Sequence, residues 1–320
     1  MMSVTEKVIW EQFVFWQKAL HLPVPTLGEK VVVTGCGTSF YLAQTLAALL
    51  NQSGRIAIAV PGSEWMLRQD CYLSDPLNWT ILGLSRSGTT TETVAALRKS
   101  SASDLRTVAL TCEPDAEISK AAQTSLHIPT HPSEGIVMSA SASLMLLAGM
   151  RMAGVALPSD LPARSNAMLQ ALDTQIDQFM RGRRHFVYLG GGARYGVACE
   201  GALKLMEMSI TPAQAFHPME YRHGPISLID AGSVIVMLYS PETIQTFAEE
   251  TALVRELQAK GALVVGIDGP GDLCLTTGMV GPGAILAALP ALQLIGERVA
   301  IAKGINTETP RHLSKVVVLA

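Results

Sequence analysis

An internal repeat constrains this chain more than any other feature of its sequence. Three short apolar runs recur at an offset of about 155 residues, and each ends in or close to glycine, serine or proline. The pairs are Val31–Gly37 with Phe186–Gly192, Thr80–Ser85 with Ile235–Ser240, and Thr107–Thr111 with Leu263–Ile267. Self-similarity at one offset indicates that the chain contains two copies of a single structural unit.

Within each copy the apolar runs alternate with segments long enough for helices, such as Phe40–Leu50, Thr91–Lys99 and Glu242–Lys260. Continuous apolar strands separated by helices predict a parallel sheet that is covered on both faces. We therefore expect an α/β protein of two tandem domains, each a doubly wound parallel sheet with helices on both faces. The expected domains are residues 28–160 and 161–309, divided near the Pro-containing stretch 157–164, with a helical segment at 1–27 and a tail at 310–320.

Composition excludes several classes of protein. The 320 residues are 48% hydrophobic and 16% charged, with a net charge of −3. These values exclude intrinsic disorder, and they give no reason to expect a nucleic-acid partner, which would require a basic surface. Five cysteines are too few, and odd in number, for a disulfide scaffold. A folded protein with an aliphatic core and reduced thiols is the expectation that remains.

The most apolar stretch of the chain is Met279–Ala302. Pro282 and Pro290 interrupt it, and Glu297 and Arg298 lie inside it. Because a membrane span needs about 20 mostly apolar residues, we expect a buried helix with a solvated tip and no membrane contact. The first residues do not have the pattern of a signal peptide, so a cytoplasmic location is expected.

Two turns rich in hydroxyl groups follow strands of the first copy. Gly35–Ser39 reads GCGTS, and Ser85–Glu92 reads SRSGTTTE, in which Thr89 and Glu92 fit a capping box at the start of a helix. Helix N-termini offer N–H groups and a positive dipole end to anions. Two such turns at neighbouring strand ends therefore predict a phosphate site, although ordinary serine and threonine caps are the alternative.

The second copy serves as an internal control. Its corresponding turns, GGGA at 190–193 and SPET at 240–243, keep the glycines or the turn but lose most of the hydroxyl groups. We therefore expect one phosphate site per chain, in the first copy. The chain contains neither GxxxxGK[ST] nor GxGxxG, so no nucleotide cofactor is expected.

Charged residues stand out in the apolar segment Ala198–Met208. Glu200, Lys204 and Glu207 have the spacing of one helix face. A solvated face with an ion pair is the ordinary interpretation. Because the remainder of this segment is apolar, we favour a buried helix whose polar stripe lines a pocket, where a carboxylate could act as a base.

A loop framed by proline and glycine follows this segment. Residues 217–225 read HPMEYRHGP and include two histidines, a glutamate, a tyrosine and an arginine, a density of reactive groups that is typical of a functional loop. A metal site with His217 and His223 is the weaker interpretation, because the spacing matches no zinc pattern. No G-x-S-x-G motif is present for a serine hydrolase.

These motifs resemble those of the SIS, or sugar isomerase, family. Within the family the likeness is to the isomerase domain of glucosamine-6-phosphate synthase and to stand-alone amino-sugar-phosphate deaminases and fructosamine-phosphate deglycases. It covers about residues 30–320, and its most specific motifs are GCGTS at 35–39, SRSGTTTET at 85–93, EGALKLMEMS at 200–209, EYRHGP at 220–225 and PRHLSK at 310–315. The resemblance implies that the two copies are tandem SIS domains.

The resemblance also assigns roles to individual residues. It implies a proton-shuttling glutamate at Glu207, a ring-opening histidine at His223, and an imine-forming lysine at Lys315 in a tail over the active site. Glu200 and Lys204 match supporting polar positions. The implied substrate- and phosphate-binding residues lie in three segments: Cys36, Gly37, Thr38 and Ser39; Ser85, Arg86, Ser87 and Thr90; and Val137 and Ser139. Arg86 stands where the synthase has glutamine, and Ser141 stands where a lysine is usual.

The implied function is aldose–ketose isomerisation of a 6-phosphosugar or amino-sugar 6-phosphate, coupled to amine release without a cofactor. We expect no glutaminase domain, because residue 2 is Met and about thirty residues precede the first strand. A plain phosphosugar isomerase and a non-catalytic phosphosugar-binding protein are the alternatives. The resemblance further implies a homodimer with shared active sites, in which the histidine loop comes from the neighbouring chain. The identity of the leaving amine stays open.

Overall fold

The computed structural model describes residues 2–317, except for the side chain of Gln178. The chain divides into two compact units. The first-copy unit comprises Val14–Leu157 with the described part of 314–320, and the second-copy unit comprises Pro158–Leu313 with the described part of 1–13. Helix α1 (Val4–Ala19) contributes residues to both.

The first-copy unit is built on a five-stranded parallel sheet with the order β2-β1-β3-β4-β5. The chain places β2 on one side of β1 and then β3, β4 and β5 on the other side. The loops that follow β1 and β3 therefore flank a topological switch point. The strands are β1 (Lys30–Gly35), β2 (Ile56–Pro61), β3 (Trp79–Ser85), β4 (Arg106–Thr111) and β5 (Thr124–His127).

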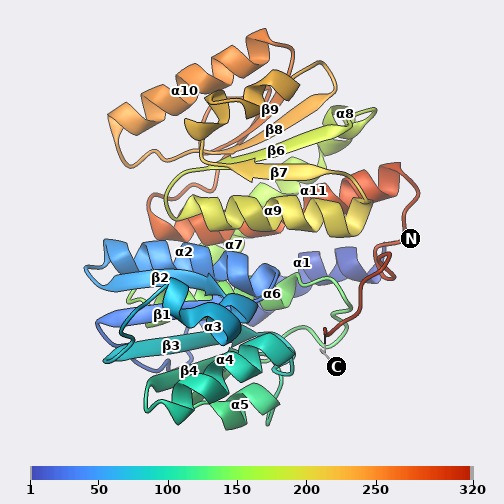
Figure 1. Ribbon diagram of the computed structural model, residues 1–320. Helices are drawn as coiled ribbons and strands as arrows, with labels where there is room; N and C mark the ends of the chain where they lie inside the picture. Colours follow the sequence, from blue (N-terminus) through green and yellow to red (C-terminus); the bar gives the residue numbers. More distant parts are fainter. Residues whose placement is uncertain (1, 318–320) are drawn as a thin grey trace. The chain divides into compact units, whose positions relative to one another are not determined.

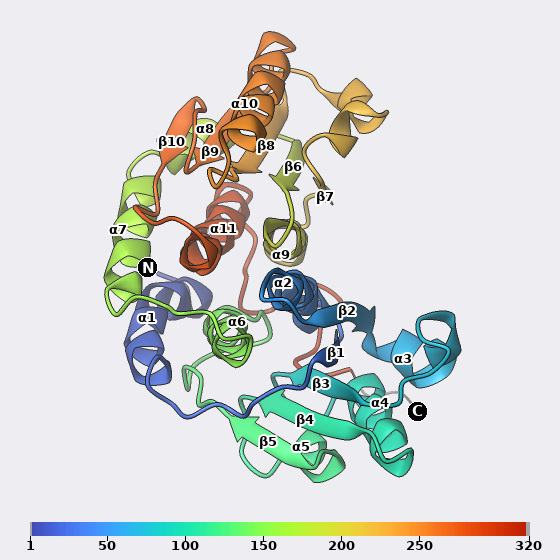
Figure 2. The same ribbon diagram turned by 90° about the vertical axis from the view of Figure 1, so that its left-hand side faces the viewer.

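Helices cover both faces of this sheet (Figure 2). On one face lie α2 (Thr38–Gln52) and α6 (Ala140–Met152). On the other lie α3 (Gly62–Arg68), which continues into the short helix η1 (Gln69–Cys71), α4 (Thr91–Ala102) and α5 (Glu117–Ala121). Close approach depends on small residues, because a Cβ atom on Gly83 of β3 would lie 2.8 Å from Leu97 Cδ1 of α4.

The second-copy unit has the same topology. Its parallel sheet has the order β7-β6-β8-β9-β10, so β6 to β10 correspond one by one to β1 to β5. The strands are β6 (His185–Gly190), β7 (Ala213–Phe216), β8 (Ser233–Leu238), β9 (Leu263–Ile267) and β10 (Leu273–Leu275). The predicted duplication and the doubly wound α/β class are therefore confirmed.

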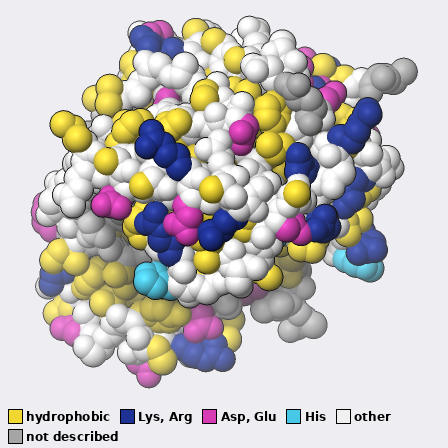
Figure 3. All heavy atoms as spheres, turned by 90° about the horizontal axis from the view of Figure 1, so that it is seen from above, with side chains coloured by type: hydrophobic (Ala, Val, Ile, Leu, Met, Phe, Trp, Pro, Cys, Tyr) yellow, Lys and Arg dark blue, Asp and Glu magenta, His cyan; other side chains and the backbone are white. Residues whose placement is uncertain are grey.

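The second sheet also lies between helices: α10 covers one face, and α9 and α11 cover the other (Figure 1). The helices of this unit are α7 (Leu161–Asp173), α8 (Ile176–Met180), α9 (Arg194–Ser209), α10 (Ile244–Ala259), α11 (Pro282–Ala302), η2 (Glu220–Arg222) and η3 (Pro225–Leu228). On the face that Figure 3 shows, acidic and basic side chains are interspersed and do not form a field of one sign.

Helix α11 is the expected apolar helix. Within residues 2–317 it alone has the length and hydropathy of a membrane span, but 89% of its most apolar window is buried, as is typical of a core helix. The expected solvation of its charges is wrong. Glu297 is 1% exposed and accepts a hydrogen bond from Ser3, while Arg298 donates to Glu6 and Asp173 at 2.6 Å each.

Candidate functional site

The first candidate loop joins β1 to α2. Gly37 occupies the N-cap with φ 56°, a left-handed conformation that favours glycine, and it has no side chain to cap the helix. A Cβ atom on Gly35 would lie 2.6 Å from Ser39 Cβ, so the glycine permits the strand to turn tightly into the helix. Thr38 and Ser39 are buried beneath the turn. Cys36 Sγ lies 3.6 Å from Thr93 Oγ1, and burial raises the pKa of this thiol.

The second candidate loop joins β3 to α4. Ser85 Oγ donates to Thr90 Oγ1 at 3.2 Å and accepts from the Gly88 amide. The expected capping box is absent, because Thr90 is the N-cap of α4 without a side-chain hydrogen bond, and Thr89 donates to Ser87 Oγ instead. The hydroxyl groups bond to one another, and none of them caps the helix.

The sheet brings these two loops together. Strands β1 and β3 are direct neighbours with Thr34 opposite Gly83, so both loops leave the same edge of the sheet at its switch point. A Cβ atom on Gly35 would lie 3.0 Å from Leu84 O, which shows how closely the two strand ends approach. Two uncapped helix N-termini and four hydroxyl-bearing residues (Ser39, Ser85, Ser87 and Thr90) thus follow neighbouring strand ends at the switch point, where open parallel sheets bind ligands. We call this set of residues the hydroxyl crevice.

Arg86 lies in the second loop and is 6% exposed. Its guanidinium donates to Gly135 O at 3.0 Å and to Lys315 O at 2.9 Å, so the loop, the segment before α6 and the tail are tied together. Lys315 is therefore held within the first-copy unit. Tail residues 318–320 lie outside the described residues.

The segment that contains Val137 and Ser139 is organised by a residue that sequence reasoning missed. Val137 and Ser139 are buried, and Glu134 Oε1 accepts hydrogen bonds from Ser139 N at 2.6 Å and Ser141 N at 3.0 Å. A carboxylate at the start of α6 stabilises the positive end of the helix dipole. Glu134 lies five residues before the N-cap Ser139, so no standard capping pattern would have revealed it.

The charged stripe of α9 is a buried ion cluster, as expected. Lys204 Nζ lies 3.5 Å from Glu200 Oε1 and forms a close ion pair with Glu207. Glu200 and Lys204 have no exposed side-chain surface, whereas Glu207 is 20% exposed. Burial alone would lower the pKa of Lys204, but the two carboxylates raise it above its ordinary value. Lys204 is thus held as a cation, and Glu207 is the member of the cluster that a ligand could reach.

The histidine loop places its reactive groups differently. The ring of His217 stacks on Tyr195 with 4.0 Å between centroids, and Arg222 donates to Glu256 at 3.0 Å. Tyr221 is buried, which raises its pKa to about 12. His223 is exposed, and within the described residues its side chain makes no hydrogen bond. The described part of the chain contains no group of three or more His, Cys, Asp or Glu side chains that could hold a metal ion.

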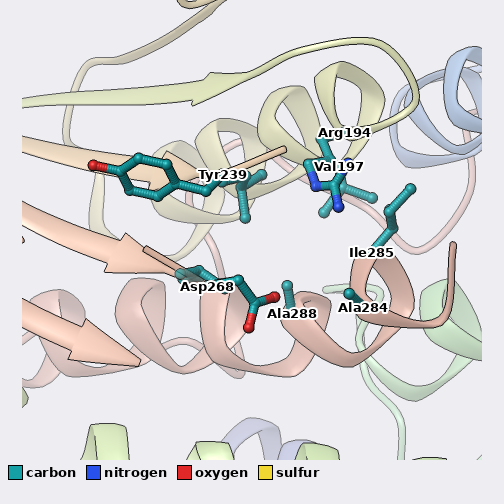
Figure 4. Close-up of a pocket in the computed structure, with 9 residues that line it drawn as sticks. Arg194, Val197, Tyr239, Asp268, Ala284, Ile285 and Ala288 are labelled. Atoms are coloured by element: carbon teal, nitrogen blue, oxygen red, sulfur yellow. The ribbon is translucent and has the colours of Figure 1, made fainter. Parts of the chain in front are cut away.

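The second copy has charged side chains where the first copy has hydroxyl groups. Arg194 and Glu242 stand at the positions of Ser39 and Ser87, and they form an ion pair at 2.5 Å. Figure 4 shows Arg194 beside Ile285 of α11, with Tyr239 and Asp268 extending from the strand ends. The void that Arg194 lines is about 10 Å³, roughly the space of one water molecule. A separate cavity of about 310 Å³ is lined by Gly191 of the same turn and by Gln245 and Thr246 of α10.

Comparisons with known proteins agree with this architecture. The model of the SIS domain matches residues 28–153 and 179–272, one segment in each copy. The chain belongs to the SIS domain family. This SIS protein is 30% identical over 324 residues to the isomerizing glutamine–fructose-6-phosphate aminotransferase of Zymomonas mobilis, a match that covers 90% of this chain and 52% of the relative. A Pyrobaculum aerophilum protein of the same name is 27% identical, with 90% and 51% covered. The chain thus spans about half the length of these relatives.

Solved structures resemble this SIS protein over nearly its whole length. Glucosamine-6-phosphate deaminase from Thermotoga maritima is 29% identical, with a TM-score of 0.86 and with 99% of this chain and 100% of that chain covered. The C-terminal domain of glucosamine-fructose-6-phosphate aminotransferase from Francisella tularensis is 21% identical, with a TM-score of 0.82 and coverages of 97% and 99%. The second likeness concerns the fold alone.

Proposed function

We propose that this SIS protein is a phosphosugar-processing enzyme that couples aldose–ketose isomerisation to the release of an amine. The observation that carries the proposal is the ion cluster of α9, in which buried Glu200 and Lys204 hold a partly exposed Glu207 carboxylate. Burying charges is costly, and a cluster that leaves one carboxylate accessible is suited to proton transfer. The similarity to a glucosamine-6-phosphate deaminase supports the same reaction class.

The substrate's phosphate is assigned to the hydroxyl crevice of the first copy. Uncapped N-termini of α2 and α4 and the hydroxyl groups of Ser39, Ser85, Ser87 and Thr90 are suited to a dianion. The second copy supports this assignment, because Arg194 and Glu242 fill its corresponding positions. Binding energy from the remote phosphate would position the sugar for chemistry at C1 and C2.

Glu207 would move the proton between the two reacting carbons. In an open-chain fructosamine 6-phosphate, the carboxylate takes a proton from C1 and returns it to C2, while the N–H proton passes to the former keto oxygen. The product is a C1 imine with a C2 hydroxyl group, and water then adds at C1 and the amine departs. Glucosamine 6-phosphate reacts in the opposite sense, through a C2 imine, and releases ammonia.

His223 would open the sugar ring by acid–base catalysis. Its exposure on the second-copy unit, at the end of η2, is consistent with a loop that serves the active site of a second chain. We therefore propose a homodimer with shared sites. Lys315, whose main chain Arg86 holds, is the candidate for an imine with the keto sugar.

The test uses Glu207→Gln, which keeps the shape of the side chain and removes its basicity. Since general acid–base catalysis contributes about 10²- to 10⁴-fold, release of amine from glucosamine 6-phosphate and from fructosamine 6-phosphates should fall by at least about 100-fold. The Kd for the phosphosugar should change little. Glu29→Gln, which alters an exposed carboxylate, is the control. Full activity of Glu207→Gln would exclude the proposed role.

Product analysis separates the alternatives. A plain isomerase would interconvert aldose and ketose phosphates without releasing ammonia or an amino acid. A non-catalytic binding protein would bind phosphosugars and convert none of them. Both measurements use the wild-type protein and the same panel of phosphosugars.

A further inference from the structure

A cavity of about 320 Å³ with charged residues in its lining lies beyond the carboxyl ends of β3, β4 and β5 in the first-copy unit. Its charged lining consists of Arg86, Lys315, Glu113 and Glu134. None of Ser39, Ser85, Ser87 and Thr90 lines it, so the cavity is separate from the hydroxyl crevice. Arg86 is the link between the two, because its neighbours Ser85 and Ser87 belong to the crevice whereas its own side chain lines the cavity.

Arg86 is a buried cation without an acidic partner. It is 6% exposed, and within residues 2–317 no carboxylate oxygen lies within 4.0 Å of its guanidinium nitrogens. Two of the five N–H groups of an arginine donate here to Gly135 O and Lys315 O, which fixes the plane of the guanidinium. Buried charges are normally paired, so the free edge of this guanidinium is suited to an anionic group of a ligand.

The nearby Glu134 does not neutralise Arg86. Its Oε1 accepts from Ser139 N and Ser141 N at the start of α6, and its Oε2 accepts from Thr130 Oγ1 at 3.0 Å. Both carboxylate oxygens of Glu134 therefore already accept hydrogen bonds, and Glu134 stabilises the N-terminus of α6. The exposed Glu113 is the other carboxylate of the lining.

The balance of charge in the lining favours a carboxylate over a phosphate. Glu113 and Glu134 do not pair with Arg86, but they line the same cavity and would repel the second charge of a phosphate dianion. A carboxylate carries one negative charge and can pair with the fixed guanidinium through two hydrogen bonds. The volume of the cavity is at the small end of the range for ligand pockets, and it is large enough for an amino acid.

We propose that this cavity receives the leaving amine of the substrate, and that this amine is an amino acid whose carboxylate pairs with Arg86. The inference rests on the proposed function and narrows its substrates to fructosamine 6-phosphates of amino acids. Arg86 is then a specificity residue for the amine and does not contact the phosphate.

The test compares two substrates that differ in one group: the 6-phosphofructosyl derivative of glycine and that of glycinamide. The wild-type enzyme should prefer the carboxylate substrate by roughly 10- to 100-fold in kcat/KM, the usual worth of hydrogen bonds to a charged group. In Arg86→Gln this ratio should fall to about one. Because the ratio is taken within each enzyme, a general loss of activity or stability cancels. Arg98→Gln, which removes an exposed guanidinium paired with Glu117, should keep the wild-type ratio.

The outcomes distinguish the inference from the proposed function. Equal kcat/KM for the two substrates in the wild-type enzyme, or an unchanged ratio in Arg86→Gln, would overturn the inference and leave the function standing. Weaker binding of inorganic phosphate to Arg86→Gln would also overturn it. If the protein converts no phosphosugar amine, the proposed function is excluded. The inference about Arg86 is then tested by comparing the Kd values of the glycine and glycinamide compounds. Free glycine is also tested as a competitor of the glycine substrate. If it binds as tightly as that substrate, the cavity binds a free amino-acid carboxylate, and its assignment to the amine part of the substrate is rejected.

Discussion

Lys204 Nζ lies 3.5 Å from Glu200 Oε1 in a part of α9 where neither side chain is exposed to solvent. Such a pair is costly to bury and contributes little net stability as a whole, but removing one partner leaves an uncompensated charge. The third member, Glu207, depends on the same lysine. The cluster therefore links the stability of α9 to the position of the proposed base.

Lys204→Met should lower the free energy of unfolding by about 3–5 kcal/mol, because Glu200 would stay buried without its cation. Urea denaturation of the purified protein measures the change. Lys7→Met is the control, since Lys7 and Glu11 have the same i,i+4 spacing at 4.0 Å on an exposed surface, where a pair is worth about 0.3–0.5 kcal/mol. Similar losses for both variants would contradict the interpretation.

Ser87→Ala should raise KM for the phosphosugar by about 10-fold while kcat stays within about twofold, because a hydroxyl–phosphate hydrogen bond remote from C1 and C2 contributes equally to ground and transition states. Steady-state kinetics measures both constants. Ser119→Ala, which removes an exposed hydroxyl group bonded to Ser125, is the matched control. A fall in kcat with unchanged KM would place Ser87 at the reacting carbons.

The sequence alone was sufficient to predict the fold. Val31, Val32 and Val33 are each fully buried, as expected for a continuous apolar strand covered on both faces. The predicted Leu263–Ile267 strand has the observed bounds of β9, and Thr91 begins α4 as predicted. Local patterns of this kind depend on neighbours in the chain, which is why they could be read without a structure.

Contacts between distant segments could not be predicted in this way. One local prediction also failed, because Thr90 and not Thr89 is the N-cap of α4, and the Thr89 hydroxyl bonds to the nearby Ser87. Arg298 was expected at a solvated tip, but Glu6 approaches it from a segment 292 residues away. The position of Arg86 likewise depends on hydrogen bonds to the main-chain carbonyls of Gly135 and Lys315. A sequence pattern of side chains does not predict such main-chain contacts.

Two inactive variants should complement each other if the active sites are shared. In a dimer of one Glu207→Gln chain and one His223→Asn chain, one of the two sites would hold both native residues. Random pairing makes half of the dimers mixed, so co-expression should restore about a quarter of the wild-type activity. This value applies to the unfractionated mixture, and the mixed dimer isolated through two different affinity tags should have about half of the wild-type activity. If the purified mixed dimer is inactive, or the active protein is a monomer, the shared site is excluded.

The five cysteines should fall into two reactivity classes. Burial raises the pKa of Cys36, Cys112 and Cys199, the last to about 11, so these thiols are protonated near neutral pH. Cys71 and Cys274 are exposed. A thiol-specific reagent at pH 8 should modify two groups rapidly in the native protein and all five in denaturant. Cys71→Ser with Cys274→Ser should abolish the fast phase, and a third fast thiol would contradict the assigned burial.

Glu250 should make the protein less stable at neutral pH than at mildly acidic pH. Burial raises the pKa of this carboxyl above its ordinary value of 4.5, although the Ser240 amide donates to it at 2.7 Å. The folded state therefore binds the proton more tightly than the unfolded chain, and the free energy of unfolding falls as the pH rises from about 4.5 through the raised pKa.

Glu250→Gln should remove this contribution, because the amide oxygen can still accept from Ser240 and carries no charge to desolvate. Relative to the wild-type protein, the variant should gain stability at pH 7 and gain less at pH 4, as measured by chemical denaturation at both values. Glu249→Gln, the exposed neighbour on α10, should show no such difference between the two pH values. A larger gain for Glu250→Gln at pH 4 than at pH 7 would reverse the sign of the linkage and show that the hydrogen bond from Ser240 outweighs the cost of burial.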